Sequence, residues 1–442
     1  MGVPTACLFN GQRLQGAKFV GKDSHAQQSG INGDRHMNDR GQFDVCVVGA
    51  GPVGGTLACL LAETGLRTAV IDHAALPPME HPGFDGRAYA VAAGSRRILE
   101  QAGLWDRLPF PPGPIRDIRV SDGKVGRPAA PLFLHFDSRE AGADVTENAF
   151  GWMVEARSLR MAINRRMAEL DLLTVHAPAR ASVTRTAETA TIAIEGGETF
   201  AASLVVAAEG RRSALRDQAG IAVTRLPYGQ TGIVVAIAHE HSHDGTALEH
   251  FLAAGPFAQL PMAGSAAEPN LSAIVWTERD AMATRLLALD DAAFAREVAR
   301  RLGTHLGQVR LVGRRWSYPL GALHAHRYTD TRLALVGDAA HGIHPIAGQG
   351  LNLGFRDVGC LADLVAAARA AGEDVGAPAL LRRYQARRRP DALAMLAATD
   401  ALDRLFSTDN PVLRAARDLG IAAVHRMPRL KRMFMRRAMG LG

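Results

Sequence analysis

Two widely separated stretches of the chain share one pattern, in which an apolar run passes through glycines into an amphipathic segment. The first is FDVCVVGAGPVGG, Phe43 to Gly55, followed by TLACLLAETG, whose apolar positions fit a helix that ends at Gly65. A second apolar run, RTAVID, ends at Asp72. Apolar, β-branched runs of this length predict buried strands, so this stretch predicts a βαβ unit.

The glycines of this unit are spaced as GxGxxG, at Gly49, Gly51 and Gly54. In this spacing the first glycine permits a tight turn, the second lets the backbone approach a pyrophosphate, and the third lets the helix pack on the strand. Asp72 follows near the offset expected for an acid that binds a ribose hydroxyl. The unit therefore predicts a dinucleotide site, with NAD and FAD as alternatives.

The second stretch, Arg332 to Val365, again predicts a strand, a loop and a helix, and it favours FAD. Asp338 stands at the carboxyl end of the strand and Pro345 stiffens the turn. The helix that follows opens with Gly348, Gln349, Gly350, Leu351 and Asn352. Free amides at a helix N-terminus stabilise negative charge, and a reduced flavin carries negative charge around N1 and its C2 carbonyl. We expect Pro345, Gly348, Gln349 and Gly350 to position that flavin.

Alternating polar and apolar positions dominate the region between these stretches. TGIVVAIAHE and its neighbours within residues 222–325 predict strands with one buried face. The chain has 442 residues, of which 47% are hydrophobic, so it can bury a large core. Its four cysteines form no CxxC pair, which favours buried free thiols over a disulfide framework.

The first 42 residues have no hydrophobic period, and the pattern predicts a flexible extension there, upstream of a candidate natural start at Met37. The extension has no apolar segment or twin-arginine pair typical of an export signal. No uncharged apolar run of the chain is long enough to span a bilayer. We therefore expect a cytoplasmic protein.

The formal charge of +7 is concentrated at the C-terminus. Residues 404–442 carry nine Lys/Arg and two Asp, which leaves the preceding residues neutral. From Ile421, apolar residues alternate with arginines in a basic amphipathic pattern that Pro428 interrupts. This favours an anionic membrane surface or an acidic partner over nucleic acid. A packed C-terminal helix explains the apolar face equally well.

Other candidate chemistry is weaker. His239, His241 and His243 have the period of a strand face, but Glu240, Ser242 and Asp244 between them indicate a polar loop and no metal site. We expect His341 and His344 to bond backbone carbonyls, and residues 382–390 to form a solvated basic helix face. The chain has neither a GxSxG elbow nor a P-loop, which argues against a hydrolase or a kinase.

With these motifs, nearly all of Phe43 to Gly442 resembles the aromatic-hydroxylase class of flavoprotein monooxygenases, and more closely the branch that hydroxylates ubiquinone precursors. The family's middle motif is present as AAEGRRSALR, with Glu209, where an Asp is usual, followed by Gly210, Ser213 and Arg216. The resemblance implies that Glu209 and Gly210 contribute to cofactor binding. It also implies that Arg87 of DGRAYAVAAGS and Arg157 of EARSLR lie beside the flavin.

The fold implied is α/β, a discontinuous Rossmann-like FAD-binding domain with an inserted β-sheet substrate domain and C-terminal helices. The expected FAD-binding domain comprises residues 43–120, 155–221 and 326–385. The substrate domain comprises residues 121–154 and 222–325, and a helical tail covers residues 386–442.

The activity implied is hydroxylation of a polyprenylated phenol or methoxyphenol, with bound FAD, O2 and NADH or NADPH as co-substrate. Ubiquinone-synthesis proteins are candidate partners, and the tail is a candidate contact with the inner face of the cytoplasmic membrane. A hydroxylase of another aromatic substrate and a non-oxygenating FAD reductase are the alternatives. A halogenase is disfavoured because the four tryptophans are isolated from one another.

Overall fold

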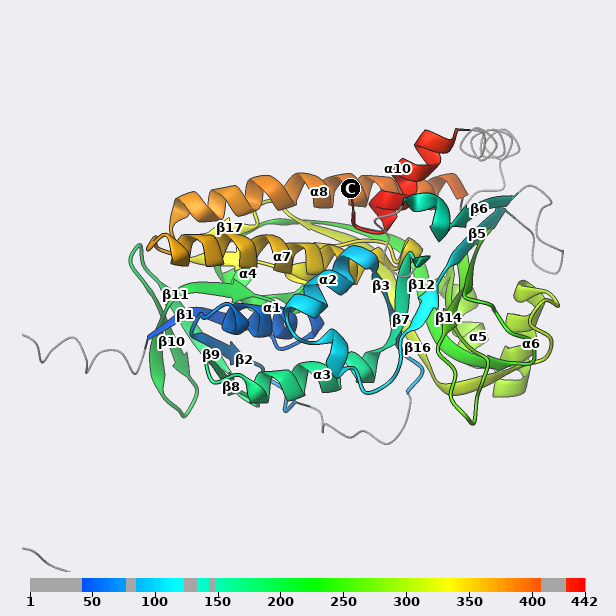
Figure 1. The fold of residues 1–442 in the computed structure, drawn as a ribbon, viewed down its shortest axis with the longest axis horizontal. Helices are drawn as coiled ribbons and strands as arrows, with labels where there is room; N and C mark the ends of the chain where they lie inside the picture. The colour runs from blue at the N-terminus through cyan, green and yellow to red at the C-terminus, as the bar shows by residue number, and fades with distance from the viewer. Residues whose placement is uncertain (1–41, 77–84, 123–132, 143–147, 407–426, 442) are drawn as a thin grey trace, which may run out of the picture. The chain divides into compact units, whose positions relative to one another are not determined.

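The computed structural model describes residues 42–76, 85–122, 133–142, 148–406 and 427–441 (Figure 1). The predicted extension therefore lies outside the described residues except for Gln42, and so do residues 407–426 of the tail. None of the helices in the described ranges is both long and apolar enough to cross a membrane.

The first sheet has eight strands and a parallel centre, in the order β17-β18-β11-β1-β2-β8, with β10 and β9 added antiparallel beside β11. Its strands are β1 (Gln42–Val48), β2 (Thr68–Ile71), β8 (Leu173–His176), β9 (Ala181–Arg185), β10 (Ala190–Ile194), β11 (Thr199–Ala207), β17 (Thr329–Asp330) and β18 (Leu333–Leu335). Helix α1 (Pro52–Glu63) joins the parallel pair β1 and β2, and it packs against α3 (Ala156–Glu169) and α7 (Gln349–Ala370). This confirms the predicted βαβ unit and the Rossmann-like α/β class.

The second sheet has the order β19-β16-β12-β15-β14-β13-β5-β6. Its strands are β5 (Asp117–Asp122), β6 (Phe133–Asp137), β12 (Val223–His239), β13 (Thr246–Leu252), β14 (Gly255–Met262), β15 (Leu271–Arg279), β16 (Val309–Ala325) and β19 (His341–Gly342). One face is covered by α5 (Asp280–Leu287) and α6 (Asp291–Leu302), which share a hydrophobic core with it. Because β19 belongs to the glycine-rich loop after β18, that loop is tied directly to this sheet.

A small third sheet connects the other two. It consists of β3 (Ala88–Ala92), β7 (Gly151–Glu155) and β4 (Gly113–Ile115), and both β4 and β7 contact β14 of the second sheet. Helix α2 (Ala93–Gln101) follows β3 directly. The sheets form one compact unit, within which the division into cofactor and substrate domains stays a prediction.

The C-terminal helices pack on one another and, through α7, on α1. Helices α7 and α8 (Pro378–Phe406) lie side by side (Figure 1), so the boundary expected after residue 385 falls inside α8. Helix α10 (Pro428–Ala438) buries Met435, and Met439 just after it is also buried. Lys431 of α10 donates a hydrogen bond to Glu140 at 2.6 Å.

Candidate active site

The turn between β1 and α1 requires glycine at two of its three predicted positions. Gly49 has φ +107°, and a Cβ there would lie 2.5 Å from the carbonyl oxygen of Ala208. A Cβ on Gly54 would lie 1.9 Å from the carbonyl oxygen of Gly49, so this glycine permits the close packing of helix on strand. A Cβ on Gly51 would meet no atom within 4 Å, and Gly51 lines the large cavity described below.

Asp72, directly after β2, holds the same turn. Its carboxylate accepts hydrogen bonds from the amides of Ala50 at 2.7 Å and Ala74 at 2.9 Å. From the other side, Arg160 of α3 donates to the carbonyl of Ala50. Asp72 also lines the cavity. The acid thus anchors the turn, and its contact with a ribose stays a prediction.

Asp338 lies in a short 3₁₀ helix, Gly337–Ala339, after β18, and its side chain reaches the cavity. Burial among protein atoms raises the pKa of its carboxyl, while the nearby charges of His341 and Arg211 oppose that rise. Gly337 has φ +57° and packs beside Val53 of α1. The loop therefore presents a carboxylate next to the glycine-rich turn.

The N-terminus of α7 opens into the cavity without a cap. Gly348 takes the left-handed conformation, with φ +62°, and a Cβ on it would lie 3.0 Å from the Cβ of Ala90. Among the described residues, no side chain caps this helix, and its first turn holds no acid. A Cβ on Gly350 would meet nothing within 4 Å. The positive end of the helix dipole, with open space in front of it, fits the anionic edge of a flavin.

Asn352 fixes this helix N-terminus to β3. Its Oδ1 accepts a hydrogen bond from the amide of Ala92 at 2.8 Å, and its Nδ2 donates to the carbonyls of Ala90 and Gly348 at 2.9 and 3.0 Å. The side chain is buried and committed to protein partners. Its predicted contribution to cofactor binding is therefore restricted to placing the cavity-lining residues Pro345, Gly348, Gln349, Gly350 and Leu351.

Beneath the loop lies a buried ionic cluster that sequence analysis missed. Asp357 of α7 accepts hydrogen bonds from the amide of Gly337 at 2.9 Å, from Nε2 of His341 at 2.6 Å and from Nε of Arg388 at 2.7 Å. Burial raises the pKa of Asp357, but His341 and Arg388 outweigh it, so the pKa lies below its ordinary value. The expectation of a wholly solvated face at residues 382–390 is wrong for Arg388, which is buried.

The two loop histidines bond side chains, so the prediction that they bond backbone carbonyls is wrong. His341 pairs with Asp357, and Nε2 of His344 lies 3.4 Å from Oε1 of Gln230 and 3.7 Å from Oδ1 of Asp403. These partners come from α7, β12 and α8, which only the tertiary fold brings to the loop. Burial lowers the pKa of His344.

The middle motif supports the Asp338 loop. The carboxylate of Glu209 accepts from the hydroxyl of Ser213 at 2.6 Å and from the amide of Leu215 at 3.2 Å, which caps α4 (Ala214–Gln218). The buried Arg216 donates to the carbonyl of Ala339 at 3.2 Å. Glu209 and Gly210 also line the cavity, where their cofactor contacts stay a prediction.

The two predicted flavin-side arginines lie outside the described lining of the cavity. Arg87 donates to Asp85 at 2.6 Å and lies over the ring of Trp316. Arg157 donates to Glu155 at 2.6 Å and lies over the ring of Phe110. Arg160, one helical turn after Arg157, contacts the glycine-rich turn by donating to the carbonyl of Ala50. Sequence reasoning selected Arg157 and missed Arg160. Its signal was the i, i+3 spacing on a helix that packs against α1.

His239 ends β12, and His241 and His243 lie in the turn that follows it. His239 is buried, and its ring nitrogens lie 2.7 Å from the carbonyl oxygen of His241 and 2.9 Å from the hydroxyl of Ser272. His243 Nε2 lies 3.0 Å from the carbonyl oxygen of Met262. Over the described part of the chain, no group of three or more His, Cys, Asp or Glu residues is arranged to hold a metal ion.

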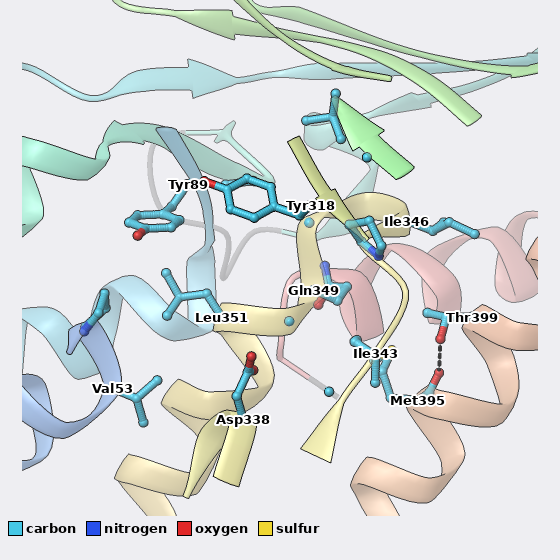
Figure 2. Close-up of a pocket in the computed structure, with 18 of the residues that line it drawn as sticks. Val53, Tyr89, Tyr318, Asp338, Ile343, Ile346, Gln349, Leu351, Met395 and Thr399 are labelled. Carbon is cyan, nitrogen blue, oxygen red and sulfur yellow. Dashed lines mark hydrogen bonds between the residues drawn. The ribbon is translucent and has the colours of Figure 1, made fainter. Parts of the chain in front are cut away.

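A cavity of about 2180 Å³ is lined by the glycine-rich turn, Asp72, Asp338, Glu209 and the start of α7. It runs from Asp72 past Asp338 and Gly350 to a predominantly apolar chamber between the second sheet and the C-terminal helices. Figure 2 shows the labelled lining residues, with Tyr89 and Tyr318 toward the sheet, Asp338, Gln349 and Leu351 around the start of α7, and Met395 and Thr399 on α8. A nucleotide-type turn and an apolar chamber thus share one space.

Comparison with known proteins agrees with this geometry. A family model described as FAD binding domain matches residues 42–399. The chain is 52% identical to ubiquinone hydroxylase UbiL of Rhodospirillum rubrum, over 90% of this chain and 89% of that protein. It is 33% identical to 3-demethoxyubiquinol 3-hydroxylase of Escherichia coli, over 90% of this chain and 98% of that protein.

Solved structures show the same fold. The crystal structure of p-nitrophenol 4-monooxygenase PnpA from Pseudomonas putida superposes with a TM-score of 0.71 at 18% identity, and covers 89% of this chain and 97% of that one.

Proposed function

Because the chain belongs to the FAD-dependent aromatic hydroxylases, in the branch of the ubiquinone hydroxylases, we propose that it hydroxylates the ring of a polyprenylated phenol or methoxyphenol in ubiquinone biosynthesis. The reaction consumes O2 and NADH or NADPH. One observation carries the proposal: the glycine-rich turn, the uncapped N-terminus of α7 and a long apolar chamber open into a single cavity.

The residues present fit FAD. The turn at Gly49, Gly51 and Gly54 with Asp72 would hold the nucleotide, and Asp338 with the first amides of α7 would hold the flavin end. When bound, FAD supplies the redox chemistry, accepting reducing equivalents from NAD(P)H and activating O2 for insertion into the ring. The chain's own contribution is to bind, orient and keep the site dry.

The amides at the start of α7 stabilise negative charge, and Gly350 leaves them accessible because nothing else fills the space in front of it. Asn352 and the Asp357 cluster fix those amides against β3 and β18. Electrostatic stabilisation by preorganised donors is a large term in enzymatic catalysis. The buried bonds under the loop thus keep the donors in place before the cofactor arrives.

The apolar chamber suits a prenyl chain. β5 and β6 contribute Val120, Leu134 and Phe136, α8 contributes Leu402 and Leu405, and α10 contributes Met435. Each buried methylene contributes about 0.8 kcal/mol of transfer free energy. A chain of several isoprene units would therefore supply much of the binding free energy, while the polar groups near α7 orient the ring.

We also propose that α10 brings the protein to an anionic membrane surface, as a peripheral contact. Met435, Arg437 and Ala438 line the cavity, whereas Arg429 and Arg432 are exposed and lie outside its lining. Met433 is also exposed. A helix with apolar and basic faces at the edge of the chamber would let a lipid substrate enter without crossing water. Other ubiquinone-synthesis proteins would meet the same substrate there.

The test is turnover of the FAD-loaded full chain with a prenylated phenol and NADH or NADPH, with and without O2. We expect a hydroxylated product only under O2, and accumulation of one quinone precursor in a deletion strain. Oxidation of NAD(P)H that reduces the substrate without O2 would instead identify the non-oxygenating reductase.

A further inference from the structure

Among the side chains that the structure describes, one acid interrupts the apolar wall that the second sheet presents to the cavity. Glu249 lies in the middle of β13, between Leu248 and His250, and it lines the cavity. Ala247 and Phe251, two residues to either side, line the cavity too, whereas Leu248 packs on the core shared with α5 and α6 and reaches the cavity only in part. Because successive side chains of a strand face opposite sides of a sheet, Glu249 belongs to the face that encloses the chamber.

The strand register shows what surrounds this carboxyl. Glu249 pairs with Val120 of β5 on one side and with Ala258 of β14 on the other. The same cross-strand row continues through Val275 of β15 to Val234 of β12. All five residues line the cavity, and Glu249 is the polar one among them.

The rows on either side are also poor in charge. One contains Ile118, Ala247, Leu260 and Ala273, and the other contains Asp122, Phe251, Pro256, Thr277, Gly232 and Tyr318, of which Asp122 is the one charged residue. An acid in such a wall loses hydration, which is costly unless another group satisfies it.

Glu249 faces the end of the cavity where the α7 loop lies. Phe251, two residues along β13, forms a hydrophobic cluster with Ile346, which directly follows Pro345, and Val120 packs against that cluster. Phe251, on the same strand as Glu249, and Val120, on the neighbouring strand, thus both contact the cluster that contains Ile346 of the loop before α7. This places the carboxyl on the wall opposite the predicted flavin positions.

No described residue satisfies the Glu249 carboxyl. Burial alone raises its pKa to about 7, with no contribution from a neighbouring charge or hydrogen bond. Among the side chains that the structure describes, β5 and β14 present no titratable group directly beside it, while Asp122 of β5 pairs with Phe251, two residues along β13. From α8, Leu402 and Leu405 line the cavity. The titratable groups that line the cavity elsewhere are Asp72, His73, Tyr89, Arg180, Glu195, Glu209, Arg211, Arg212, Arg225, Tyr318, Asp338, Asp391 and Arg437.

We propose that Glu249 binds the ring hydroxyl of the substrate and takes its proton, which makes it a catalytic residue of the hydroxylation. This inference rests on the proposed function. The O–H bond of the phenol breaks, its electrons stay on the ring oxygen, and the carboxylate becomes a carboxylic acid. The pair keeps one negative charge throughout. A phenolate ring is richer in electrons and is therefore more easily attacked by an electrophilic oxygen. On product release the proton returns to the product oxygen.

The apolar wall makes Glu249 a better base for this purpose. A phenol such as tyrosine has a pKa of about 10, and general bases work best when their pKa lies near the working pH. A carboxyl with a pKa of about 7 is closer to the phenol than an ordinary glutamate, and it still ionises at neutral pH. Tyr318 lies in the adjoining row, where its hydroxyl can donate a hydrogen bond.

The first experiment measures protons taken up on binding, independent of turnover. Isothermal titration calorimetry in buffers of different ionisation enthalpy is applied to the FAD-loaded full chain at about pH 8, with a geranylated 4-nitrophenol as the probe. The probe and Glu249 are both largely anionic there, and two like charges cannot both persist in the apolar wall. We expect the wild type to take up about one proton per probe bound, and Glu249→Gln to take up none.

Three controls separate this effect from a general loss of polarity. Thr277→Val removes a hydroxyl from the adjoining row without removing an acid, and it should retain the proton uptake. Glu249→Asp keeps the acid and should also retain it, with weaker binding. The methyl ether of the probe has no acidic hydroxyl and should bind the wild type without uptake. Equal uptake by the wild type and Glu249→Gln would overturn the proposal.

The second experiment follows hydroxylation against pH. The wild-type rate should fall as the pH drops below about 7, whereas Glu249→Gln should lose this limb and turn over roughly 10²–10⁴-fold more slowly, the range for loss of a general base. A variant that keeps the wild-type profile contradicts the role of Glu249 and leaves the hydroxylase function intact. If no prenylated phenol is hydroxylated, the proposed function fails. The number of protons taken up when the probe binds still decides whether Glu249 is the base.

Discussion

Asp357 and His341 form a buried pair, joined by a 2.6 Å hydrogen bond beneath the loop that carries Asp338. The same carboxylate also accepts from Arg388 of α8 and from the amide of Gly337. One acid on α7 therefore fixes the end of β18, the loop and α8 together. The geometry of the candidate flavin site depends on this pair, although the pair itself does not line the cavity.

Asp357→Asn should destabilise the protein by about 3 kcal/mol or more, because it leaves the buried guanidinium of Arg388 without its main counter-charge. The measurement is urea unfolding, together with the fraction of FAD retained after gel filtration, which should also fall. Asp363→Asn is the matched control on the same helix, since Asp363 is exposed, and it should change stability by less than about 0.5 kcal/mol.

The same pair predicts how stability responds to acid. The pKa of Asp357 is lower in the folded protein than its ordinary value of 3.8. A carboxyl of this kind contributes stability that is present above its unfolded pKa and lost as the pH falls through the folded pKa. Below about pH 4, the wild type should therefore lose stability more steeply than Asp357→Asn. Parallel slopes for the two proteins would contradict the assigned ion pair.

For Glu249 we expect the opposite pH dependence of folding stability. Its pKa is raised from 4.5 to about 7 in the folded protein, so the folded state holds a proton that the unfolded state has already lost between these values. Stability is then highest below 4.5 and decreases as the pH rises toward 7. Without added phenol, Glu249→Gln should gain about 3 kcal/mol over the wild type at about pH 8, and this gain should vanish near pH 4.

The control for that measurement is Glu188→Gln, which alters an exposed glutamate in the turn between β9 and β10. It should leave the pH dependence of stability as in the wild type. A Glu249→Gln protein that gains nothing at high pH would show that this carboxyl is hydrated through the cavity.

Two glycines of the candidate site should respond to substitution in opposite ways. Gly54→Ala places a Cβ 1.9 Å from the carbonyl oxygen of Gly49 and should prevent folding or FAD uptake altogether. Gly350→Val meets nothing within 4 Å and should fold with a melting temperature close to the wild type. Its side chain would occupy the space in front of the α7 amides, so hydroxylation should fall on the order of 10²-fold. Unchanged hydroxylation by Gly350→Val would refute the assignment of these amides to the flavin.

Local patterns made part of this site predictable. Gly49 and Gly54 lie within one turn, and Gly348 opens the helix that follows its own loop, so each requirement is set by residues close in sequence. The Rossmann-like class followed from the same local units. The partners of Asp357 and the surroundings of Glu249 were not predictable, because both depend on which strands and helices become neighbours. In the sequence Arg388 is one of several arginines in a basic run. It is buried because α8 packs beside α7, where Arg388 donates to Asp357.

The final prediction concerns the basic helix at the edge of the chamber. Removing α10 would also remove the buried Met435 and Met439, so truncation would confuse membrane binding with unfolding. Substitution of its exposed arginines avoids this problem. Replacing Arg429 and Arg432 together by Gln should weaken sedimentation with anionic vesicles at low salt by roughly 30-fold or less, at up to about 1 kcal/mol per charge. High salt should abolish the difference, because exposed charges are screened.

The matched control replaces Arg285 and Arg296 by Gln, which removes the same charge from exposed positions of α5 and α6 on the other side of the second sheet. This variant should bind vesicles like the wild type if α10 forms the contact, because the attraction acts on charges within about a Debye length of the lipid. Equal losses in both variants would show that net charge alone governs the interaction. Vesicle binding that neither variant weakens would assign the contact to another surface, and the lipid substrate would then have to enter the chamber by a route that does not pass α10.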